Sequence, residues 1–222
     1  MNDALLWIGV GTALVAGLWS GYTVFYEGQL EQPAYETVLR QSVFEVRRYE
    51  PFIVATTPIR GQGRAQMSDG FRSLAGYIFG RNQPQEKLAM TAPVLATTGE
   101  ALGMTAPVIT DRSAGHMAFV MPSQRTLNDL PRPTGRGISL KTTDWGLVAA
   151  VRYAGYATEE RVQRQTKSLN EWLTKQGYEV RGEALSAQYN SPSAMPLLRR
   201  NEILIPVRPV VTVLSSSASE AE

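Results

Sequence analysis

The sequence of 222 residues contains no cysteine and a single histidine, His116. The lack of cysteine excludes disulfide frameworks, thiolate nucleophiles and cysteine-ligated zinc or iron–sulfur sites, and any His-dependent triad must use His116. The sequence also has no large excess of either charge, because its 22 Lys and Arg residues are nearly balanced by 20 Asp and Glu residues. This balance does not provide the basic surface that nucleic acid requires, so we expect no nucleic-acid partner.

Charge is absent altogether from Ala4 to Phe25. As a helix rising about 1.5 Å per residue, this stretch is about 33 Å long and covers a hydrocarbon core of about 30 Å. A cleaved signal peptide is the alternative, but no Lys or Arg precedes the apolar run and no A-x-A cleavage site follows it. The sequence therefore predicts a membrane protein with an uncleaved transmembrane anchor over residues 1–26, inserted through residues 4–25.

The charges that flank this segment predict its orientation. No Lys or Arg occurs before Arg40, whereas Glu27 and Glu31 follow the apolar run, so nothing positive holds the downstream side in the cytoplasm. We expect the folded domain on the outer side, which is the periplasm in a Gram-negative bacterium. Small residues recur every four positions in the segment, and a homodimer could form through this stripe: they are Gly9, Ala13, Gly17 and Gly21. The alternative is that glycine is simply common in membrane helices.

The folded domain is predicted over residues 27–209, and the polar tail over 210–222 is expected to be disordered. Two stretches of the domain match at a constant offset of 94 residues, Phe44–Gly61 and Ile138–Gly155, with apolar residues opposite apolar residues and a glycine as the last residue of both. The alternation within each stretch predicts a β-hairpin. The domain is therefore expected to be a duplicated unit.

A helix and further strands follow each predicted hairpin. Apolar residues at helical spacing predict helices over Met67–Phe79 and Thr158–Gln176. Strands are expected in five further runs: Lys87–Val94, Ala101–Thr110, His116–Pro122, Tyr178–Tyr189 and Glu202–Val207. Two such units close most simply into one antiparallel sheet or barrel flanked by two helices, so the fold class is α+β.

Four ordered motifs are distinctive when taken together. They are YETVLRQSVFEVRRYEP at Tyr35–Pro51, KLAMTAPV at Lys87–Val94, MAFVMPS at Met117–Ser123, and YNSP followed by LLRRNEILIPV within Tyr189–Val207. The chain thereby resembles the SOUL haem-binding protein family over almost the whole folded domain. The resemblance implies a distorted antiparallel β-barrel from a duplicated hairpin-helix-strand unit with two flanking helices, similar to small-molecule effector-binding domains of some bacterial regulators. It also implies non-catalytic binding of haem or another tetrapyrrole.

The resemblance places the ligand in an apolar cleft between the first helix and the loop before the last strand, Asn190–Leu198. The expected cofactor-binding residues are Met67, Phe71, Leu74, Ala75 and Ile78 on the helix, Met195 and Leu197 on the opposite lip, and Arg199 and Arg200 at the propionates. Each apolar residue has the alternative of packing in the core. The arginines have the alternative of an ion pair with Glu202.

The iron ligand is not determined by the sequence. Haem iron takes His, Cys, Met or Tyr, and His116 is predicted in a turn, where histidines are usually solvated. Tyr77, Tyr189 or the absence of a strong protein ligand are the alternatives. Met90 and Met104, in two copies of MTAPV, are expected in the core. So few ligands favour carriage, buffering or sensing of the macrocycle over a redox centre.

Two other classes of function remain open. A small-molecule hydrolase or effector-binding domain can be built on the same barrel, because fold does not decide function. The hydrolase requires a buried carboxylate with a raised pKa, for which Glu183 and Glu202 are the candidates. A scaffold that organises partner proteins is the third class, and the small-residue stripe in the membrane segment is its only indication.

Overall fold

The computed structural model describes residues 30–60, 64–97, 114–190 and 194–210. The predicted anchor, its small-residue stripe, the second MTAPV copy with Met104 and the predicted tail beyond Val210 lie outside these residues. Within the described ranges, no helix combines the length and the apolar character needed to cross a bilayer.

The described elements follow the alternation predicted from the sequence. In chain order they are β1 (Tyr35–Gln41), β2 (Phe44–Tyr49), β3 (Phe52–Arg60), α2 (Arg64–Ile78), β4 (Asn82–Gln83), β5 (Val94–Thr97), β6 (Ala114–Val120), β7 (Arg132–Pro133), β8 (Ser139–Thr143), β9 (Leu147–Ala154), α3 (Glu159–Lys175), β10 (Tyr178–Val180), β11 (Leu185–Gln188), the 3₁₀ helix η3 (Pro196–Leu198) and β12 (Arg200–Pro209). The segment β2–β3–α2 recurs as β8–β9–α3, in agreement with the duplicated unit.

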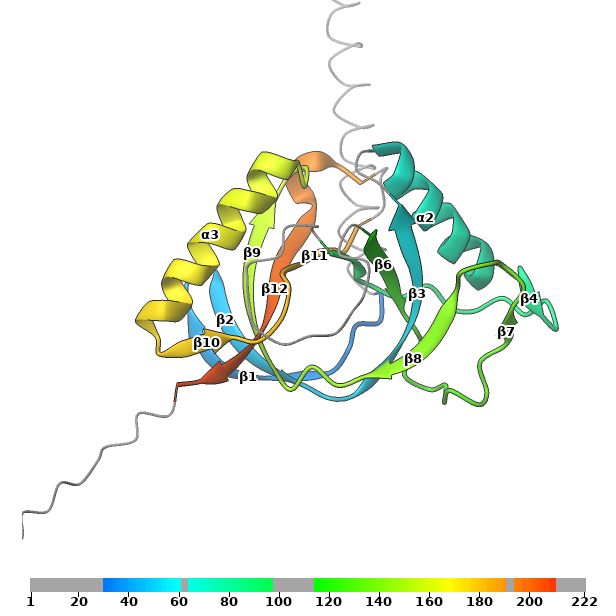
Figure 1. Cartoon of the computed structure of the whole chain (residues 1–222), viewed down its shortest axis with the longest axis horizontal. Helices are drawn as coiled ribbons and strands as arrows, with labels where there is room; N and C mark the ends of the chain where they lie inside the picture. The colour runs from blue at the N-terminus through cyan, green and yellow to red at the C-terminus, as the bar shows by residue number, and fades with distance from the viewer. Residues whose placement is uncertain (1–29, 61–63, 98–113, 191–193, 211–222) are drawn as a thin grey trace, which may run out of the picture.

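One antiparallel sheet dominates the fold. Its strand order is β1-β2-β9-β12-β11-β5-β6-β3-β8, with β10 paired to β12, and β4 pairs separately with β7. Figure 1 shows this sheet curled into a half-barrel, with α3 and α2 on the outside at its two sides. The α+β class and the two helices are confirmed. The predicted distorted barrel is confirmed in part: it is an open half-barrel, because the edge strands β1 and β8 do not pair with each other in the described part of the chain.

The two predicted hairpins do not form. β2 pairs with β9 and β3 pairs with β8, so each of these strands pairs with a strand of the other repeat unit. The register is continuous, since Phe44 lies opposite Val151 and, eight residues along each chain, Phe52 lies opposite Thr143. Between them the N–H of Tyr49 donates to the carbonyl oxygen of Gly146 over 2.9 Å. The chain between β2 and β3, at Glu50–Pro51, and the chain between β8 and β9 therefore bend but do not reverse direction as a hairpin turn would.

The strand predicted over Lys87–Val94 is also corrected, because β5 begins only at Val94. Pro93 has no N–H to donate to a neighbouring strand, and the N–H of Ala92 donates to the carbonyl oxygen of Glu31 outside the main sheet. Met90 is 43% exposed, so the expectation that it packs in the core is wrong.

The core consists of three clusters that follow the alternation of side chains along the strands. Residues at odd positions of β9 and β12 pack beneath α3, with Leu169 and Leu173 from the helix. α2 covers a second cluster that includes Met117 and Phe119 of β6. The concave face of the half-barrel holds the third cluster, with Val120 and Leu204. Each strand therefore separates a helix-covered outer face from a concave inner face.

Candidate functional site

α2 is an amphipathic helix whose buried face points into the core. Leu74 and Ile78, two of the predicted ligand-binding residues, are completely buried there together with Tyr77. Their side chains therefore offer no surface to a ligand outside the helix. Phe71 and Ala75 are half-buried at the boundary of the same face, as is Met67. Of the predicted helix residues, only these three remain accessible.

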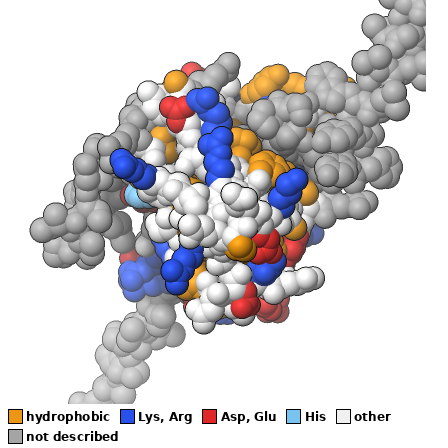
Figure 2. Space-filling model, turned by 90° about the vertical axis from the view of Figure 1, so that its right-hand side faces the viewer, with side chains coloured by type: hydrophobic (Ala, Val, Ile, Leu, Met, Phe, Trp, Pro, Cys, Tyr) orange, Lys and Arg blue, Asp and Glu red, His pale blue; other side chains and the backbone are white. Residues whose placement is uncertain are grey.

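A shallow depression follows the outer side of α2. Its volume is about 660 Å³, within the range of about 300–1,000 Å³ that is usual for small-molecule pockets. It is lined by Asp69, Phe71, Arg72, Ser73, Ala75, Gly76, Phe79 and Arg81. Figure 2, which looks onto the α2 side of the domain, shows hydrophobic side chains between Lys and Arg side chains on this face. The depression thus combines an apolar floor with cationic edges.

Two phenylalanines give this surface its aromatic character. The ring of Phe71 packs edge-to-face on Phe119 of β6, with 5.3 Å between the ring centroids, which ties one end of the surface to the core. Phe79, directly after the helix, remains 57% exposed. Phe71 and Phe79 both line the depression, so together they supply its aromatic surface.

The chain leaves α2 through a Schellman turn. The N–H of Gly80 donates to the carbonyl oxygen of Tyr77 over 3.3 Å, and the N–H of Arg81 donates to that of Gly76 over 2.8 Å. Gly80 has a φ of 106°, which a residue with a side chain rarely adopts. This turn fixes where Arg81 starts relative to the last turn of the helix.

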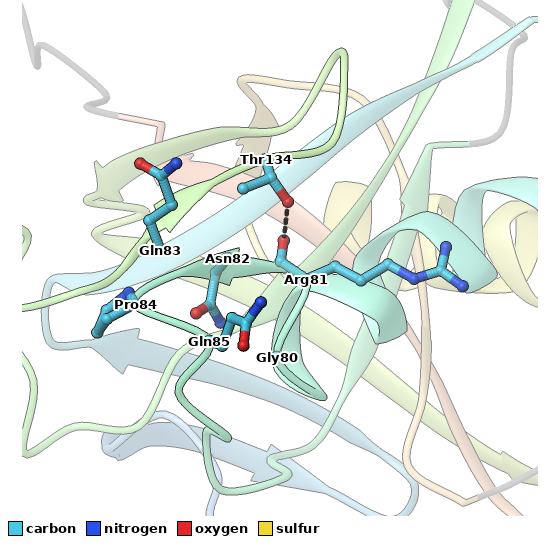
Figure 3. Close-up of a pocket in the computed structure, with 7 residues that line it drawn as sticks. All are labelled: Gly80, Arg81, Asn82, Gln83, Pro84, Gln85 and Thr134. Atoms are coloured by element: carbon cyan, nitrogen blue, oxygen red, sulfur yellow. Dashed lines mark hydrogen bonds between the residues drawn. The ribbon is translucent and has the colours of Figure 1, made fainter.

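The segment after the turn is held by its own hydrogen bonds. The buried amide of Asn82 donates to the carbonyl oxygens of Tyr77 and Glu86, each over 2.8 Å. The hydroxyl of Thr134 donates to the carbonyl oxygen of Arg81 over 2.7 Å, and Figure 3 shows this bond while the Arg81 side chain extends away from the other labelled residues. A second depression of about 540 Å³ is lined by Gly80, Arg81, Asn82, Gln83, Pro84, Gln85 and Thr134. The backbone of Arg81 is therefore pinned on both sides.

The outer face of α3 differs from that of α2, although the two helices occupy equivalent positions in the two repeat units. Its exposed positions carry Gln163, Arg164, Lys167 and Glu171, and Lys167 lies 4.0 Å from Glu171. A charged, solvated face of this kind is what a helix without a ligand requires. The aromatic outer surface thus belongs to α2 alone among these two helices.

The predicted lip around η3 does not come together as one surface. Met195 is half-buried, and Leu197 is 82% exposed. The two arginines diverge, because the guanidinium of Arg199 lies 4.6 Å from the ring centroid of Tyr156 while that of Arg200 pairs with Glu202 on the concave face. Arg199 and Arg200 therefore do not form one clamp, and the alternative of an ion pair is confirmed for Arg200.

A buried polar network, which the sequence did not predict as a unit, occupies the concave face around Glu202. Its carboxylate is fully buried and accepts two hydrogen bonds from Arg47, of 2.7 and 3.1 Å, and two from Arg200, of 2.8 and 3.1 Å. The hydroxyl of Tyr189 adds a fifth over 2.7 Å. Arg200 also stacks on the Tyr189 ring at 4.0 Å. Only the strand register could have revealed this, since Arg47 and Glu202 are 155 residues apart.

The network sets the charge state of its members. Burial by itself would raise the pKa of Glu202, but the hydrogen bonds and charge of Arg47, with Arg200 and Tyr189, outweigh it and hold that pKa below its ordinary value. Burial also raises the pKa of Tyr189 well above its ordinary value. Glu202 is therefore ionised at neutral pH, and Glu183, the other candidate, is exposed.

The candidate iron ligands lie away from the α2 depression. The hydroxyl of Tyr77 is buried and donates to the carbonyl oxygen of Pro131 over 2.9 Å, and that of Tyr189 is engaged by Glu202. His116 lies within β6, not in a turn as predicted, and alternates with Met117 and Phe119, which face α2. Its side chain is therefore directed to the opposite face of the sheet. None of the residues that line the depression is His, Cys, Met or Tyr.

Comparison with known proteins identifies the family. The profile of the SOUL heme-binding protein family matches residues 30–206. The chain belongs to this family. Heme-binding protein 2 from Homo sapiens is 27% identical over 163 residues, covering 72% of this chain and 76% of the relative.

Solved structures share the fold at low sequence identity. An uncharacterized conserved protein from Listeria innocua has a TM-score of 0.55 and 12% identity, covering 74% of this chain and 92% of its own. A hydrolase from the same organism has a TM-score of 0.54 and 11% identity, covering 77% and 94%. At such identities these similarities concern the fold alone.

Proposed function

We propose that this SOUL-family protein binds haem or a related tetrapyrrole on the outer face of α2, and that it carries, buffers or senses the macrocycle without catalysing a reaction on it. The observation that carries the proposal is the aromatic depression with cationic edges, present on α2 and replaced by a charged face on α3. Family membership and the human relative named Heme-binding protein 2 support the choice of ligand.

The residues of the depression fit the macrocycle. Phe71, Ala75 and Phe79 offer a flat apolar surface for one face of the ring, and Arg72 and Arg81 provide donors for carboxylates at its edge. Because the depression is shallow, the other face of the ring stays accessible to solvent or to a partner. This arrangement suits transient binding and transfer of the ligand better than permanent retention.

The depression fits the porphyrin better than it fits the iron. A bound haem supplies an iron centre, but no side chain lining the depression is of the type that ligates it. The chain's own residues therefore bind and orient the ring through apolar contact and edge charges. Iron-free protoporphyrin should bind about as tightly as haem.

The remaining sequence predictions about placement join this proposal. Tethering by residues 4–25 keeps the domain on the outer side of a membrane, and pairing through the small-residue stripe yields a homodimer. Met195, Leu197 and Arg199 act as an outer lip only if the loop 190–198 approaches α2 when ligand binds. None of these three lines the depression, which makes the helix face the primary contact.

Neither of the two carboxylates considered for the hydrolase alternative, Glu183 and Glu202, has the environment that it needs in the described part of the chain. General acid or base catalysis requires a carboxylate with a raised pKa in an accessible pocket. The pKa of Glu202 is lowered, and its carboxylate is fully buried among Arg47, Arg200 and Tyr189. A hydrolase from Listeria innocua shares the fold, but nothing at this site favours that activity.

The decisive experiment replaces Phe79 by glutamate in the full-length protein held in lipid nanodiscs. A charge placed against the apolar face of the ring should weaken both haem and protoporphyrin binding by at least about tenfold. Phe79 is the better target than Phe71, because its exposed ring does not hold the core together. Binding is followed by the quenching of tryptophan fluorescence, with empty nanodiscs as the background.

Leu127→Glu is the matched control, since Leu127 is 42% exposed and does not line the depression. It should leave both affinities unchanged. If Phe79→Glu binds as wild type does, or if both variants lose binding equally, the helix face is not the site.

A further inference from the structure

The side chain of Arg81 lies across the outer surface of α2 at Gly76. A Cβ atom placed on Gly76 would be only 3.0 Å from Cδ of Arg81, 3.4 Å from Nε and 3.6 Å from Nη1. The absence of a side chain at position 76 therefore creates the space in which the arginine lies. The Schellman turn brings the two residues together, because the N–H of Arg81 donates to the carbonyl oxygen of Gly76.

The equivalent turn of α3 has different residues. It also ends at a glycine of positive φ, Gly177, whose N–H donates to the carbonyl oxygen of Thr174. The two positions that correspond to Gly76 and Arg81 are Leu173 and Tyr178, and both belong to the apolar cluster beneath α3. An apolar contact at these positions is the usual companion of a Schellman turn. At α2 the stabilising contact has been replaced by a glycine and a cation.

The charge of Arg81 has no acidic partner among the described residues. The ion pairs found there include Arg72 with Asp69, on the same helix, but none includes Arg81. Arg81 is also exposed, and it borders both depressions at this end of the domain. The hydroxyl of Thr134 donates to the carbonyl oxygen of Arg81, which fixes the backbone from which the guanidinium side chain extends.

We propose that Arg81, laid across Gly76, recognises a carboxylate of the ligand and makes the protein selective for tetrapyrroles with free acidic side chains. The inference rests on the proposed binding of a tetrapyrrole to α2. The guanidinium presents several N–H donors in a planar fork that matches a carboxylate, and Phe79 lies within the same depression for the ring. Arg72, already paired with Asp69, is a secondary contact.

The test compares protoporphyrin IX with its dimethyl ester, which keeps the ring and removes both negative charges. Full-length protein in lipid nanodiscs is titrated with each, and empty nanodiscs provide the background. We expect wild type to bind the free acid about tenfold more tightly than the ester, as for one charge-assisted hydrogen bond. Arg81→Gln should lose most of this preference by weakening binding of the acid, with the ester affected less than about twofold.

Two further variants separate recognition from packing and from general charge. Arg164→Gln removes an exposed arginine from α3 and should keep the wild-type preference. Gly76→Ala favours the helix, because alanine has the higher helix propensity, but its Cβ 3.0 Å from Cδ of Arg81 makes the arginine side chain shift by a few tenths of an ångström. We expect Gly76→Ala to reduce the preference for the acid without lowering the melting temperature.

The outcomes distinguish this inference from the proposed function. Equal binding of acid and ester by wild type, with both saturable, overturns the role of Arg81 and leaves the tetrapyrrole site intact. An equal loss of preference in Arg81→Gln and Arg164→Gln overturns it too, because overall charge would then be the cause. If neither porphyrin shows saturable binding to wild type, the proposed function itself is wrong.

Discussion

Replacement of Glu202 by glutamine should destabilise the fold strongly although it changes the volume of the side chain little. The carboxylate is fully buried and accepts five hydrogen bonds, four of them from the guanidinium groups of Arg47 and Arg200. The amide has one oxygen where the carboxylate has two, and it carries no charge. Arg47, itself buried, then loses its main counterion.

The size of the effect follows from the environment of Arg47. Breaking a buried ion pair by removing one partner costs about 3–5 kcal/mol, because the remaining charge stays buried. Here Glu45 still accepts a hydrogen bond of 2.5 Å from Nε of Arg47, so we expect a loss at the lower end, about 3 kcal/mol. With a urea dependence of about 2 kcal/mol per molar, the unfolding midpoint falls by about 1.5 M.

The same substitution should alter the dependence of stability on pH. The pKa of Glu202 is lower in the folded protein than its ordinary value of 4.5, so the unfolded chain binds this proton more readily. The stabilisation is therefore complete above about pH 4.5 and is lost as the pH falls towards the lowered folded pKa. Glu202→Gln removes this contribution, and its free energy of unfolding should fall less steeply below about pH 4.5 than that of wild type.

Urea unfolding of the full-length protein in mild detergent, followed by tryptophan fluorescence at several pH values, measures both effects. Glu183→Gln is the matched control, because Glu183 is exposed, and it should change the free energy of unfolding by less than about 0.5 kcal/mol. A variant Glu202→Gln as stable as this control would refute the reasoning that the network is a strong buried ion pair.

The remaining predictions concern the ligand, the anchor and the turn. His116→Ala should leave haem affinity within about twofold of wild type and leave the Soret band unshifted, because His116 faces away from α2. The full-length protein should stay with membranes during carbonate extraction, since residues 4–25 provide an apolar hold. Gly80→Ala should lower the free energy of unfolding by about 1 kcal/mol or more in a urea titration, since its φ of 106° strains alanine.

Local patterns were sufficient to predict the elements. Both helices and most strands follow from the apolar spacing, from the glycines at the helix ends and from the repeat offset of 94 residues. Thr158, the first residue of the predicted helix, lies just before α3 and caps it by accepting from the N–H of Arg161. Signals for helices and strands depend on residues that are close together in the chain, so they can be recognised without knowing how the chain folds.

Pairing between distant strands was not predictable in the same way. A bend such as Glu50–Pro51 has the composition of a hairpin turn, and only the competition between partners decides whether the chain reverses there. β2 pairs with β9 and β3 pairs with β8, and both of these partners belong to the other repeat unit. The network around Glu202 depends on that exchange, since Arg47 comes from β2 and Glu202 from β12, with β9 between them. Its members could not be assembled from one segment.

The candidate site was partly predicted for the same reason. The helix was expected to carry the site, and the aromatic depression lies along it, but an apolar stripe does not reveal which of its residues face the core, and Leu74 and Ile78 do. Phe79 and Arg81 were missed as site residues because they lie beyond the last apolar residue of the periodic pattern, and Gly76 because a glycine inside the helix adds nothing to that pattern. Their signal was a glycine inside a helix and a cation after the terminal glycine, where the other repeat has Leu173 and Tyr178.

That difference between the repeats suggests how one duplicated unit came to serve two purposes. The concave face cannot easily change, because Arg47 of β2 and Arg200 of β12 both form ion pairs with the buried Glu202 of β12 there. The outer faces of the helices carry no such constraint, since substitutions on an exposed helix surface change stability by about 0.5 kcal/mol or less. A binding surface could therefore arise on α2 while α3 kept its apolar turn and its charged exterior. By this reasoning, grafting Leu and Tyr from α3 into α2, as Gly76→Leu with Arg81→Tyr, should preserve folding but abolish the preference for the free acid, and a retained preference would contradict it.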